Sequence, residues 1–373
     1  MSISKQYVYL FTSPAIDIKE TMIVISMRII SNMKKDIKSY SFSELAQLCK
    51  DCGQPTFRSK QLIHWLYRIG VSSYDEMTNL PKTFREKINE IAPLYPSKII
   101  DKQISKDGTR KYVIEYHDGA RVEAVGMPSS KSLSVCFSTQ AGCAMECAFC
   151  ATGTEGLTRN LTSGEMIDQL LLVQNDFQTR ISHVVTMGQG EPFQNYDAVL
   201  EALRFLNAKD GFEIGARHIT LSTCGIISGI EKLSNEPEQF TLAISLHSAR
   251  QEIRNKLMPR CSSLPLPQLK ESLLQYITKT GRRVSFEYLM IKGINDTKQD
   301  LDALKEFCES LLCHINLIPI NSVDHSPYQP SSKETMKHWI SELTSINKET
   351  TIRNSRGSDI DGACGQLKNK LSK

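Results

Sequence analysis

The sequence predicts an α/β protein, an incomplete (β/α)6 barrel preceded by a small helical N-terminal domain and a connecting β-hairpin. Three observations support this fold class. From Leu133 onward, short runs rich in β-branched residues alternate with helical patterns, an order typical of a parallel sheet. Between Ser41 and Ile91, apolar residues recur at helical spacing. Residues 111–127 alternate in period two around Asp118-Gly119, which is a strong hairpin signal.

These patterns divide the chain into five segments. We expect a disordered extension (1–35), a helical accessory domain (36–95), a β-hairpin linker (96–130), the partial barrel (131–348) and a C-terminal tail (349–373). The barrel segment contains six predicted strands, namely SVCFST, HVVTMG, HITLST, TLAISLH, RVSFEYLMI and HINLIPI.

The composition is that of an ordinary globular protein. The chain has 373 residues, of which 40% are hydrophobic, enough for a large core. Its longest apolar run near the N-terminus, Met22–Met27, is too short to cross a membrane, and we recognise no secretory signal. Eleven cysteines without such a signal indicate reduced thiols in the cytoplasm. The net charge of +4 does not by itself indicate a nucleic-acid partner, although Lys34–Gly70 and the tail after Thr350 are basic.

Three closely spaced cysteines form the strongest chemical signal. The segment Cys143-Ala-Met-Glu-Cys147-Ala-Phe-Cys150 has the spacing C-x3-C-x2-C. Three thiolates so placed can bind three irons of a cubane cluster and leave the fourth iron open to a substrate. Zinc is the alternative, but it prefers a fourth Cys or His, and the next histidine, His183, lies in a predicted strand. Unliganded structural cysteines are the remaining interpretation.

Polar motifs follow several predicted strands directly. Gly190-Glu191, Ser222, Ser245–His247 and Asn321 each stand at the end of one strand. The C-terminal ends of the strands meet at one face of such a barrel, where its chemistry gathers. We therefore expect these residues to share one site.

The cysteine spacing, with an aromatic residue before the last cysteine, resembles that of the radical S-adenosylmethionine (SAM) superfamily. Met187-Gly-Gln-Gly-Glu-Pro192 is similar to the glycine-rich SAM-binding motif of that superfamily. The resemblance implies that Cys143, Cys147 and Cys150 hold a [4Fe–4S] cluster and that SAM binds its open iron. It also implies a set of SAM contacts, consisting of Gly190, Glu191, Ser222, Ser245, Leu246, His247 and Asn321.

Further motifs narrow the resemblance to the RlmN/Cfr family of RNA adenosine methyltransferases. They occur in the expected order from about Ser41 to Leu367, and five of them are Cys136-Phe-Ser-Thr-Gln-Ala-Gly-Cys143, Ala151-Thr-Gly-Thr-Glu-Gly-Leu-Thr-Arg-Asn160, Leu221-Ser-Thr-Cys-Gly225, Ile244-Ser-Leu-His247 and Asp359-Ile-Asp-Gly-Ala-Cys364-Gly-Gln-Leu367. Two positions depart from the family pattern. Gln189 stands where the family usually has Met, and Ser322 follows Asn321 where it usually has Pro.

The family's chemistry gives two further cysteines a role. The resemblance implies that Cys364 takes a methyl group from one SAM, and that a radical made from a second SAM abstracts hydrogen from that methyl group. The carbon radical then adds to an adenine carbon that is not nucleophilic. Glu123 is the candidate base for the ring proton. Cys136 would form a transient disulfide with Cys364 and so release the methylated RNA.

The resemblance also implies the substrates and partners. These are 23S rRNA at the peptidyl-transferase centre and tRNA next to the anticodon, with a flavodoxin or ferredoxin as electron donor and a monomeric enzyme. Glu191-Pro192 is closer to the RlmN branch, which favours methylation at C2 of adenosine over the Cfr-like C8. A radical SAM enzyme of another class, such as a glycyl-radical activase, and a non-enzymatic RNA-binding protein with a cluster or zinc remain as alternatives.

The helical N-terminal domain is a candidate RNA-binding surface. It carries basic and aromatic side chains that suit phosphates and bases, namely Arg58, Lys60, Trp65, Tyr67 and Arg68. The two aromatic residues are equally consistent with a place in the core.

Overall fold

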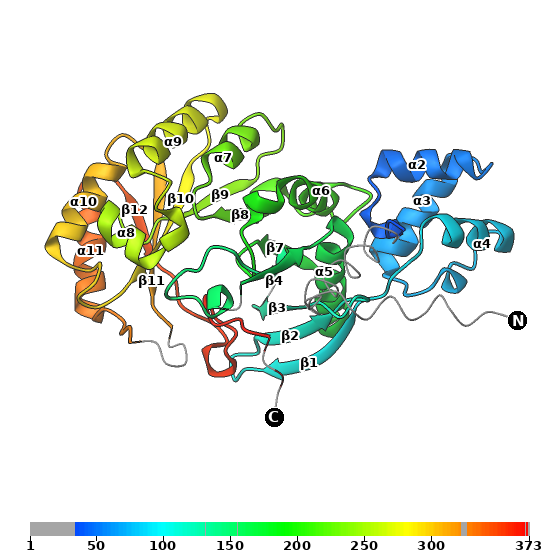
Figure 1. The fold of residues 1–373 in the computed structure, drawn as a ribbon, viewed down its shortest axis with the longest axis horizontal. Helices are drawn as coiled ribbons and strands as arrows, with labels where there is room; N and C mark the ends of the chain where they lie inside the picture. Colours follow the sequence, from blue (N-terminus) through cyan, green and yellow to red (C-terminus); the bar gives the residue numbers. More distant parts are fainter. Residues whose placement is uncertain (1–33, 131, 155, 322–326, 370, 372–373) are drawn as a thin grey trace, which may run out of the picture.

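The computed structural model describes residues 34–130, 132–154, 156–321, 327–369 and 371, so the expectation for residues 1–35 falls almost entirely outside the described part. Among these residues, ten strands form one sheet in the order β1-β2-β3-β4-β7-β8-β9-β10-β11-β12 (Figure 1). The strands β1 and β12 stand at opposite edges and do not pair with each other. The barrel is therefore incomplete, as predicted.

A helical domain precedes the sheet and lies to one side of it in Figure 1. Its helices are α2 (Phe42–Asp51), α3 (Phe57–His64) and α4 (Lys82–Ile91), and a π-helical turn (Trp65–Ile69) follows α3. Ser41 starts α2 with a capping box, because its hydroxyl accepts the Glu44 N–H (3.2 Å) while its own N–H donates to the Glu44 carboxylate (2.7 Å). The predicted small helical domain is thus confirmed.

The predicted hairpin consists of β2 (Arg110–Glu115) and β3 (Arg121–Pro128), which pair antiparallel. Gly119 in its turn has φ +82°, a conformation that favours glycine. The sequence did not reveal β1 (Lys98–Ile104), which pairs antiparallel with β2. Because β3 also pairs with β4, the hairpin extends the main sheet as well as linking it to the helical domain.

The parallel part of the sheet contains all six predicted strands. They are β4 (Leu133–Cys136), β7 (Ile181–Val185), β8 (Ile219–Thr223), β9 (Thr241–Ser245), β10 (Val284–Met290) and β11 (Cys313–Pro319). A further parallel strand, β12 (Glu349–Ile352), pairs with β11 at the edge, inside the segment expected to be an irregular tail. The helices between them are α5 (Ser163–Phe177), α6 (Tyr196–Asn207), α7 (Ile227–Leu233), α8 (Gln251–Leu257), α9 (Leu266–Thr280), α10 (Lys298–Cys308) and α11 (Lys333–Ser345).

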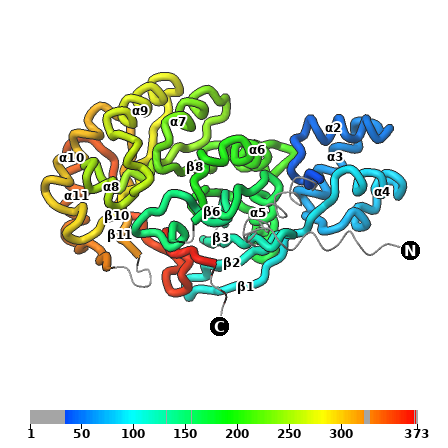
Figure 2. Tube along the Cα trace, in the orientation of Figure 1, coloured from blue at the N-terminus to red at the C-terminus, as the bar shows by residue number. Residues whose placement is uncertain are grey.

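The chain after β12 returns across the molecule toward the antiparallel strands, as Figure 2 shows. Two contacts fix it there. The Arg356 guanidinium donates to the Pro128 carbonyl (2.6 Å), and the Ser105 hydroxyl donates to the Asp359 carboxylate (2.6 Å). The C-terminal segment is therefore held beside the end of β3.

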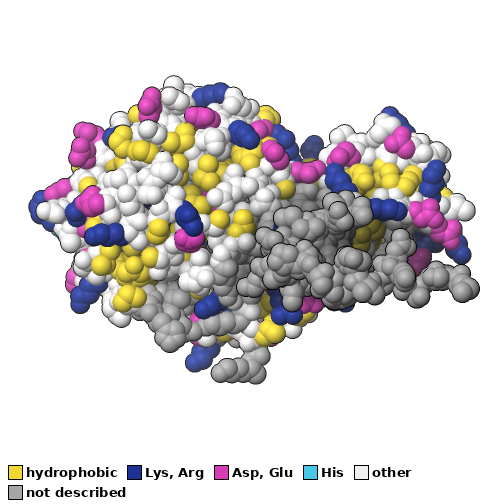
Figure 3. Space-filling model, viewed as in Figure 1, with side chains coloured by type: hydrophobic (Ala, Val, Ile, Leu, Met, Phe, Trp, Pro, Cys, Tyr) yellow, Lys and Arg dark blue, Asp and Glu magenta, His cyan; other side chains and the backbone are white. Residues whose placement is uncertain are grey.

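Charged side chains of both signs are mixed on the face seen in Figure 3, with no large patch of one sign. This agrees with the small net charge of +4. None of the helices among the described residues is both long enough and apolar enough to span a bilayer.

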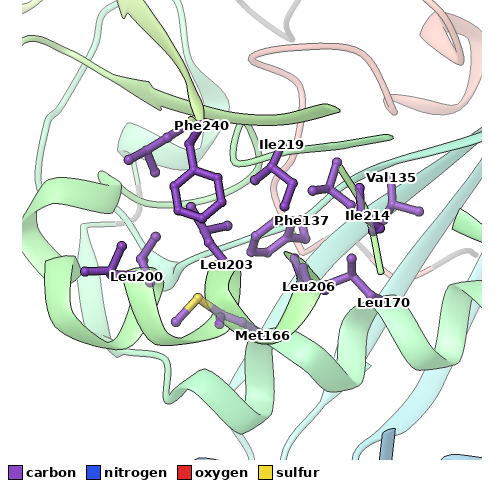
Figure 4. Packing of buried hydrophobic residues seen from close by; sticks show 14 of the residues in the cluster. Val135, Phe137, Met166, Leu170, Leu200, Leu203, Leu206, Ile214, Ile219 and Phe240 are labelled. Carbon is purple, nitrogen blue, oxygen red and sulfur yellow. The ribbon is translucent and has the colours of Figure 1, made fainter. Parts of the chain in front are cut away.

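The core that positions the strand ends lies between the sheet and the helices α5 and α6. Val135, Phe137 and Ile219 on the sheet side pack with Met166 and Leu203 from the helices (Figure 4), and all five are completely buried. Such packing fixes neighbouring strands in register, because a well-packed interior leaves little room for sliding.

A buried ion pair joins the start of the helical domain to the barrel. The Lys38 ammonium lies 2.5 Å from the Asp168 carboxylate on α5, and the two side chains are only 5% and 7% exposed. The Ser97 hydroxyl also donates to Asp168 (2.6 Å).

We expect Lys38→Met to destabilise the protein by about 3–5 kcal/mol, because it leaves Asp168 as an unpaired buried charge. Urea unfolding of this variant, of the double variant described next and of the wild type measures the free energy of unfolding of each. The double variant Lys38→Met/Asp168→Leu is the control and should recover most of the loss, since replacing both partners of a buried pair is often neutral. Equal stability of the single and the double variant would contradict this account.

Candidate active site

The three closely spaced cysteines lie in one loop between β5 (Gln140–Gly142) and a 3-10 helix (Ala151–Thr154). We call residues 143–150 the cluster loop. Its end is a tight turn, in which the Cys150 N–H donates to the Cys147 carbonyl (3.0 Å). The three cysteines line a single cavity, here called the first cavity. The loop therefore presents its three thiols to one space at the C-terminal ends of the strands.

These thiols fit a cluster better than a single metal ion. No group of three or more His, Cys, Asp or Glu side chains in the described part of the chain is arranged to hold one metal ion, as zinc would require. In a cubane cluster each thiolate binds a different iron, so its ligands need not converge on one point. Burial raises the pKa of Cys143 to about 11 and raises that of Cys147 as well, so loading a cluster must release protons from these thiols.

The glycines after β7 allow a close approach of two backbone segments. A Cβ on Gly188 would lie 2.7 Å from the Phe137 carbonyl carbon, and a Cβ on Gly190 would lie 2.7 Å from the Gln140 side chain. Gly190 also has φ +104°, which disfavours other residues. Both positions therefore require glycine, and both line the first cavity.

Glu191 is a buried carboxylate at the wall of the first cavity. Its two oxygens accept the N–H groups of Phe193 (3.0 Å) and Cys224 (2.7 Å), and burial raises its pKa despite these bonds. A carboxylate has acceptor capacity for further donors beyond these two. Glu191 therefore fits a role in receiving a ligand's ammonium group.

The structure brings most of the other predicted SAM contacts to the same space. Ser222 at the end of β8, Ser245 at the end of β9, His247 and Asn321 all line the first cavity. Leu246 does not. Its side chain is completely buried in the main core, and its N–H and carbonyl are bonded to the Glu287 carbonyl (3.1 Å) and the Arg254 guanidinium (2.6 Å).

His247 has an unusual backbone and a fixed ring. Its φ is +55°, and its Nδ1 accepts the Leu289 N–H (3.1 Å). Burial lowers its pKa to about 3, so the ring is neutral and carries its proton on Nε2. Phe149 of the cluster loop packs edge-on against this ring, with centroids 4.7 Å apart.

The segment that carries Cys364 is hydrogen-bonded to the 3-10 helix that directly follows the cluster loop. The Ala151 N–H donates to the Gly365 carbonyl (2.7 Å), and the Thr152 hydroxyl donates to the Leu367 carbonyl (2.8 Å). Asn321 also donates to the Cys364 carbonyl (3.2 Å). These contacts place the exposed Cys364 at the wall of the first cavity.

Cys136, the last residue of β4, lines a second cavity that also contains Cys364. Burial, together with the neighbouring Cys364, raises the pKa of Cys136 to about 12. All eleven cysteines are free thiols, so the structure does not contain the Cys136–Cys364 disulfide that the resemblance implied as a transient state.

Glu123 lies in β3 and is completely buried, but it lines neither cavity. Its carboxylate is 3.2 Å from the Lys111 ammonium and accepts the Lys368 N–H (2.6 Å). Burial raises its pKa, while Lys111 lowers it. Glu123 therefore contacts the segment that carries Cys364 through the Lys368 N–H, outside the lining of the two cavities.

Sequence reasoning missed two arginines, of which Arg254 is buried and Arg353 is partly exposed. Arg254 is completely buried and donates to the carbonyls of Ser245 (2.9 Å), Leu246 and Cys224, which ties together the ends of β8 and β9. Arg353 lines both cavities and lies 3.5 Å from the Glu287 carboxylate. Arg353 stands eleven residues before Cys364 in the run TIRNSRGSDIDGAC. This closeness in sequence to the carrier cysteine is the signal that could have pointed to Arg353.

The N-terminal candidates for RNA contact are mostly engaged within the protein. Tyr67 is a core residue whose hydroxyl donates to the Lys38 carbonyl (3.0 Å), which agrees with the core alternative rather than with base stacking. Trp65 is half-buried and donates to Asn79 (2.7 Å), and Arg58 also donates to Asn79 (3.0 Å). Arg68 donates to the Lys209 carbonyl (2.8 Å), while Lys60 is exposed.

Two family models match the chain. Residues 35–94 match the ribosomal RNA large subunit methyltransferase N-terminal domain, and residues 137–308 match the radical SAM superfamily. The expected [4Fe–4S] cluster and SAM are thereby confirmed as its cofactors, since they define that superfamily.

Similar proteins extend these matches over most of the chain. A probable dual-specificity RNA methyltransferase RlmN from Clostridium novyi is 42% identical over 335 residues, covering 90% of this chain and 98% of the relative. Its counterpart from Alkaliphilus oremlandii is 43% identical over 338 residues, with coverages of 90% and 98%. The crystal structure of a radical SAM methyltransferase from Sphaerobacter thermophilus superimposes with a TM-score of 0.86 and 39% identity, covering 90% of this chain and 100% of that one. The chain belongs to the RlmN family of radical SAM RNA methyltransferases.

Proposed function

We propose that this protein methylates C2 of adenosine, in 23S rRNA at the peptidyl-transferase centre and in tRNA next to the anticodon, with Cys364 as carrier of the transferred carbon. The position of Cys364 carries the proposal. Its segment is hydrogen-bonded to the 3-10 helix that directly follows the cluster loop, and Cys364 lines the same cavity as Cys143, Cys147 and Cys150. A carrier thiol must reach the centre where the transferred group is activated.

The residues of the first cavity fit the two cofactors. Cys143, Cys147 and Cys150 would hold the cluster, and the set that would hold SAM is Gly190, Glu191, Ser222, Ser245, His247 and Asn321. For Leu246 we propose only a supporting role, because it packs in the core. When bound, the two cofactors supply a methyl group and a radical that abstracts hydrogen from it.

The protein's own groups then handle the carbon and the proton. Cys364 carries the methyl group as a thioether, and after loss of one hydrogen atom its carbon adds to C2 of the adenine. The unpaired electron that this addition leaves on the ring must be given up to an acceptor, a role that the bound cluster would serve. Glu123 takes the proton from C2, and its raised pKa suits a base that works near neutral pH. Because Glu123 is completely buried and lines neither cavity, the segment carrying Cys364, whose Lys368 N–H it accepts, has to shift for the ring to reach it.

Cys136 completes the cycle. Its sulfur attacks the sulfur of Cys364, the bond between that sulfur and the transferred carbon breaks, and the electron pair leaves with the carbon, which takes up a proton. The product is a Cys136–Cys364 disulfide, which an external thiol reduces. The shared second cavity supports this pairing, because both cysteines line it.

We further propose a flavodoxin or ferredoxin as electron donor, a monomeric enzyme and a place in the cytoplasm. The support is chemical, since the cluster must receive an electron and free thiols persist in a reducing compartment. Methylation at C8 is the alternative to C2, and the Glu191-Pro192 pair favours C2.

We expect the modified nucleoside to be 2-methyladenosine. Digested rRNA and tRNA from a deletion strain expressing this chain should contain it, and chromatography with mass detection against both isomers identifies it. The same strain expressing Cys364→Ala is the matched control and should lack it. A product that co-elutes with 8-methyladenosine refutes the C2 assignment, and its presence in only one RNA class restricts the substrates to that class.

A further inference from the structure

The second cavity is used in the proposed mechanism only for the pairing of Cys136 with Cys364, and no ligand has been assigned to it. Its lining includes the two cysteines Cys136 and Cys364 and three further residues, His183, Arg217 and His218, which we call its mouth. The three mouth residues are exposed, whereas Cys136 is buried. The cavity therefore gives access from solvent to the proposed carrier cysteine from a side other than that of the cluster loop.

The charged side chains that line this cavity are all positive. Its lining includes Arg217, Arg353 and Arg356, and none of the described residues that line it is an Asp or Glu. Arg353 and Arg356 are paired with the carboxylates of Glu287 and Asp107 outside it. Among the described residues, the Arg217 guanidinium donates hydrogen bonds only to the neutral Gln239 (3.1 Å) and forms no ion pair. A cationic mouth of this kind attracts an anion such as a phosphodiester.

The mouth also offers ring faces. The imidazoles of His183 and His218 are stacked, with centroids 4.4 Å apart and planes at 25°. Exposed histidine rings can stack with bases that are turned out of an RNA loop. Cation and ring faces at one opening suit a nucleotide better than an inorganic anion.

The positions of the two cysteines fit a transfer of the methyl-derived carbon from the first cavity to the second. Cys364 lines both cavities, whereas Cys136 lines only the second one. The residues assigned to the cluster and SAM line the first cavity, so a base must approach Cys364 from elsewhere. Cys136 releases the RNA in the proposed mechanism, and it stands on the side where the RNA would then be.

We infer that the second cavity is the entrance for RNA, through which the target adenosine reaches Cys364 while Arg217 binds a flanking phosphate. This inference rests on the proposed function and specifies the RNA site within it. Cys364 would then acquire its methyl group from the side of the first cavity and deliver the carbon into the second.

Protection of introduced cysteines tests the entrance. Ser355 lines the second cavity, and Ser263 lies in a shallow pocket beside the cluster loop; both are exposed. Ser355→Cys and Ser263→Cys are alkylated with iodoacetamide, with and without an RNA hairpin that has an adenosine in its loop, and peptides are quantified by mass spectrometry. At RNA concentrations about tenfold above Kd, we expect the Ser355→Cys site to react about tenfold more slowly, because the rate follows the free fraction. The Ser263→Cys site should keep its rate.

A charge variant provides the second measurement. Arg217→Ala should weaken binding of the same hairpin about fivefold and reduce the slope of log K against log salt by about 0.7, the value for one phosphate contact of a single strand. Arg260→Ala is the matched control, because Arg260 is exposed beside the cluster loop and pairs with Glu146 there.

The outcomes separate the inference from the function. Protection of Ser355→Cys together with weaker binding by Arg217→Ala supports the entrance. Protection of Ser263→Cys and weaker binding by Arg260→Ala, with normal methylation by the wild type, overturn the entrance and leave the function intact. A wild-type protein that neither binds nor methylates RNA overturns both.

Discussion

We expect each of the variants Cys143→Ala, Cys147→Ala and Cys150→Ala to lose the iron–sulfur cluster and to cleave SAM at least about a hundredfold more slowly. Replacing a residue that only supports a metal ligand can already lower activity about a hundredfold, so losing a ligand should cost at least as much. All three thiols line the first cavity, and no other cysteine than Cys224 and Cys364 shares it. Iron and sulfide content, the charge-transfer absorption and the yield of 5′-deoxyadenosine from anaerobic protein measure the effect.

Cys261→Ala is the matched control for these variants. Cys261 is a completely buried thiol in the small core beside the cluster loop, packed near Cys143 and Cys147, but it does not line the cavity. It should keep its iron and its cleavage activity. If all three cavity variants retain a full iron content, the cysteine spacing has been misinterpreted, and so has the chemistry that depends on it.

The parallel strands could be predicted because they are buried, and the edges could not because they are exposed. Strands such as β10 and β11 are mostly apolar and contain no exposed residue. By contrast, β1 and β12 are edge strands in which exposed residues recur, and β12 has only four residues. A short half-exposed strand has neither the apolar run nor the length that a sequence pattern detects.

The site could be predicted where a motif stays within one loop, and not where the fold joins distant segments. Cys143, Cys147 and Cys150 reach one cavity because eight consecutive residues carry them. The bond between Ala151 and Gly365 spans more than half the chain, and only the folded backbone can place it. Leu246 shows a further limit, since its position within a strand-end motif does not reveal that its side chain packs in the core.

The arginines were missed for a related reason. Arg254 lies in a helix whose sequence is compatible with a solvated face, and its burial depends on three carbonyls from two strand ends. A buried arginine is uncommon and requires such partners. Because the partners are backbone groups, no side-chain pattern in the sequence indicates them.

The two outlying cysteines should give opposite results when each is replaced. Cys364→Ala is expected to produce neither methylated RNA nor any covalent protein–RNA species, because the transferred carbon then has no carrier. Cys136→Ala should still accept the methyl group on Cys364 and attack the RNA, but it cannot form the disulfide that frees the product. It should therefore accumulate a covalent adduct.

Denaturing gels with and without nuclease, and intact-protein mass spectrometry, separate these results. Wild-type protein from SAM-replete cells should show the added mass of one CH2 on the peptide containing Cys364. Cys308→Ala serves as control, because Cys308 is a buried thiol at the end of α10 that lines neither cavity, and its turnover should be normal. The adduct of Cys136→Ala should also depend on Cys364, so the double variant Cys136→Ala/Cys364→Ala should show none. Normal turnover by Cys136→Ala, or residual methylation by Cys364→Ala, would exclude the proposed carrier mechanism while leaving the cluster and the fold untouched.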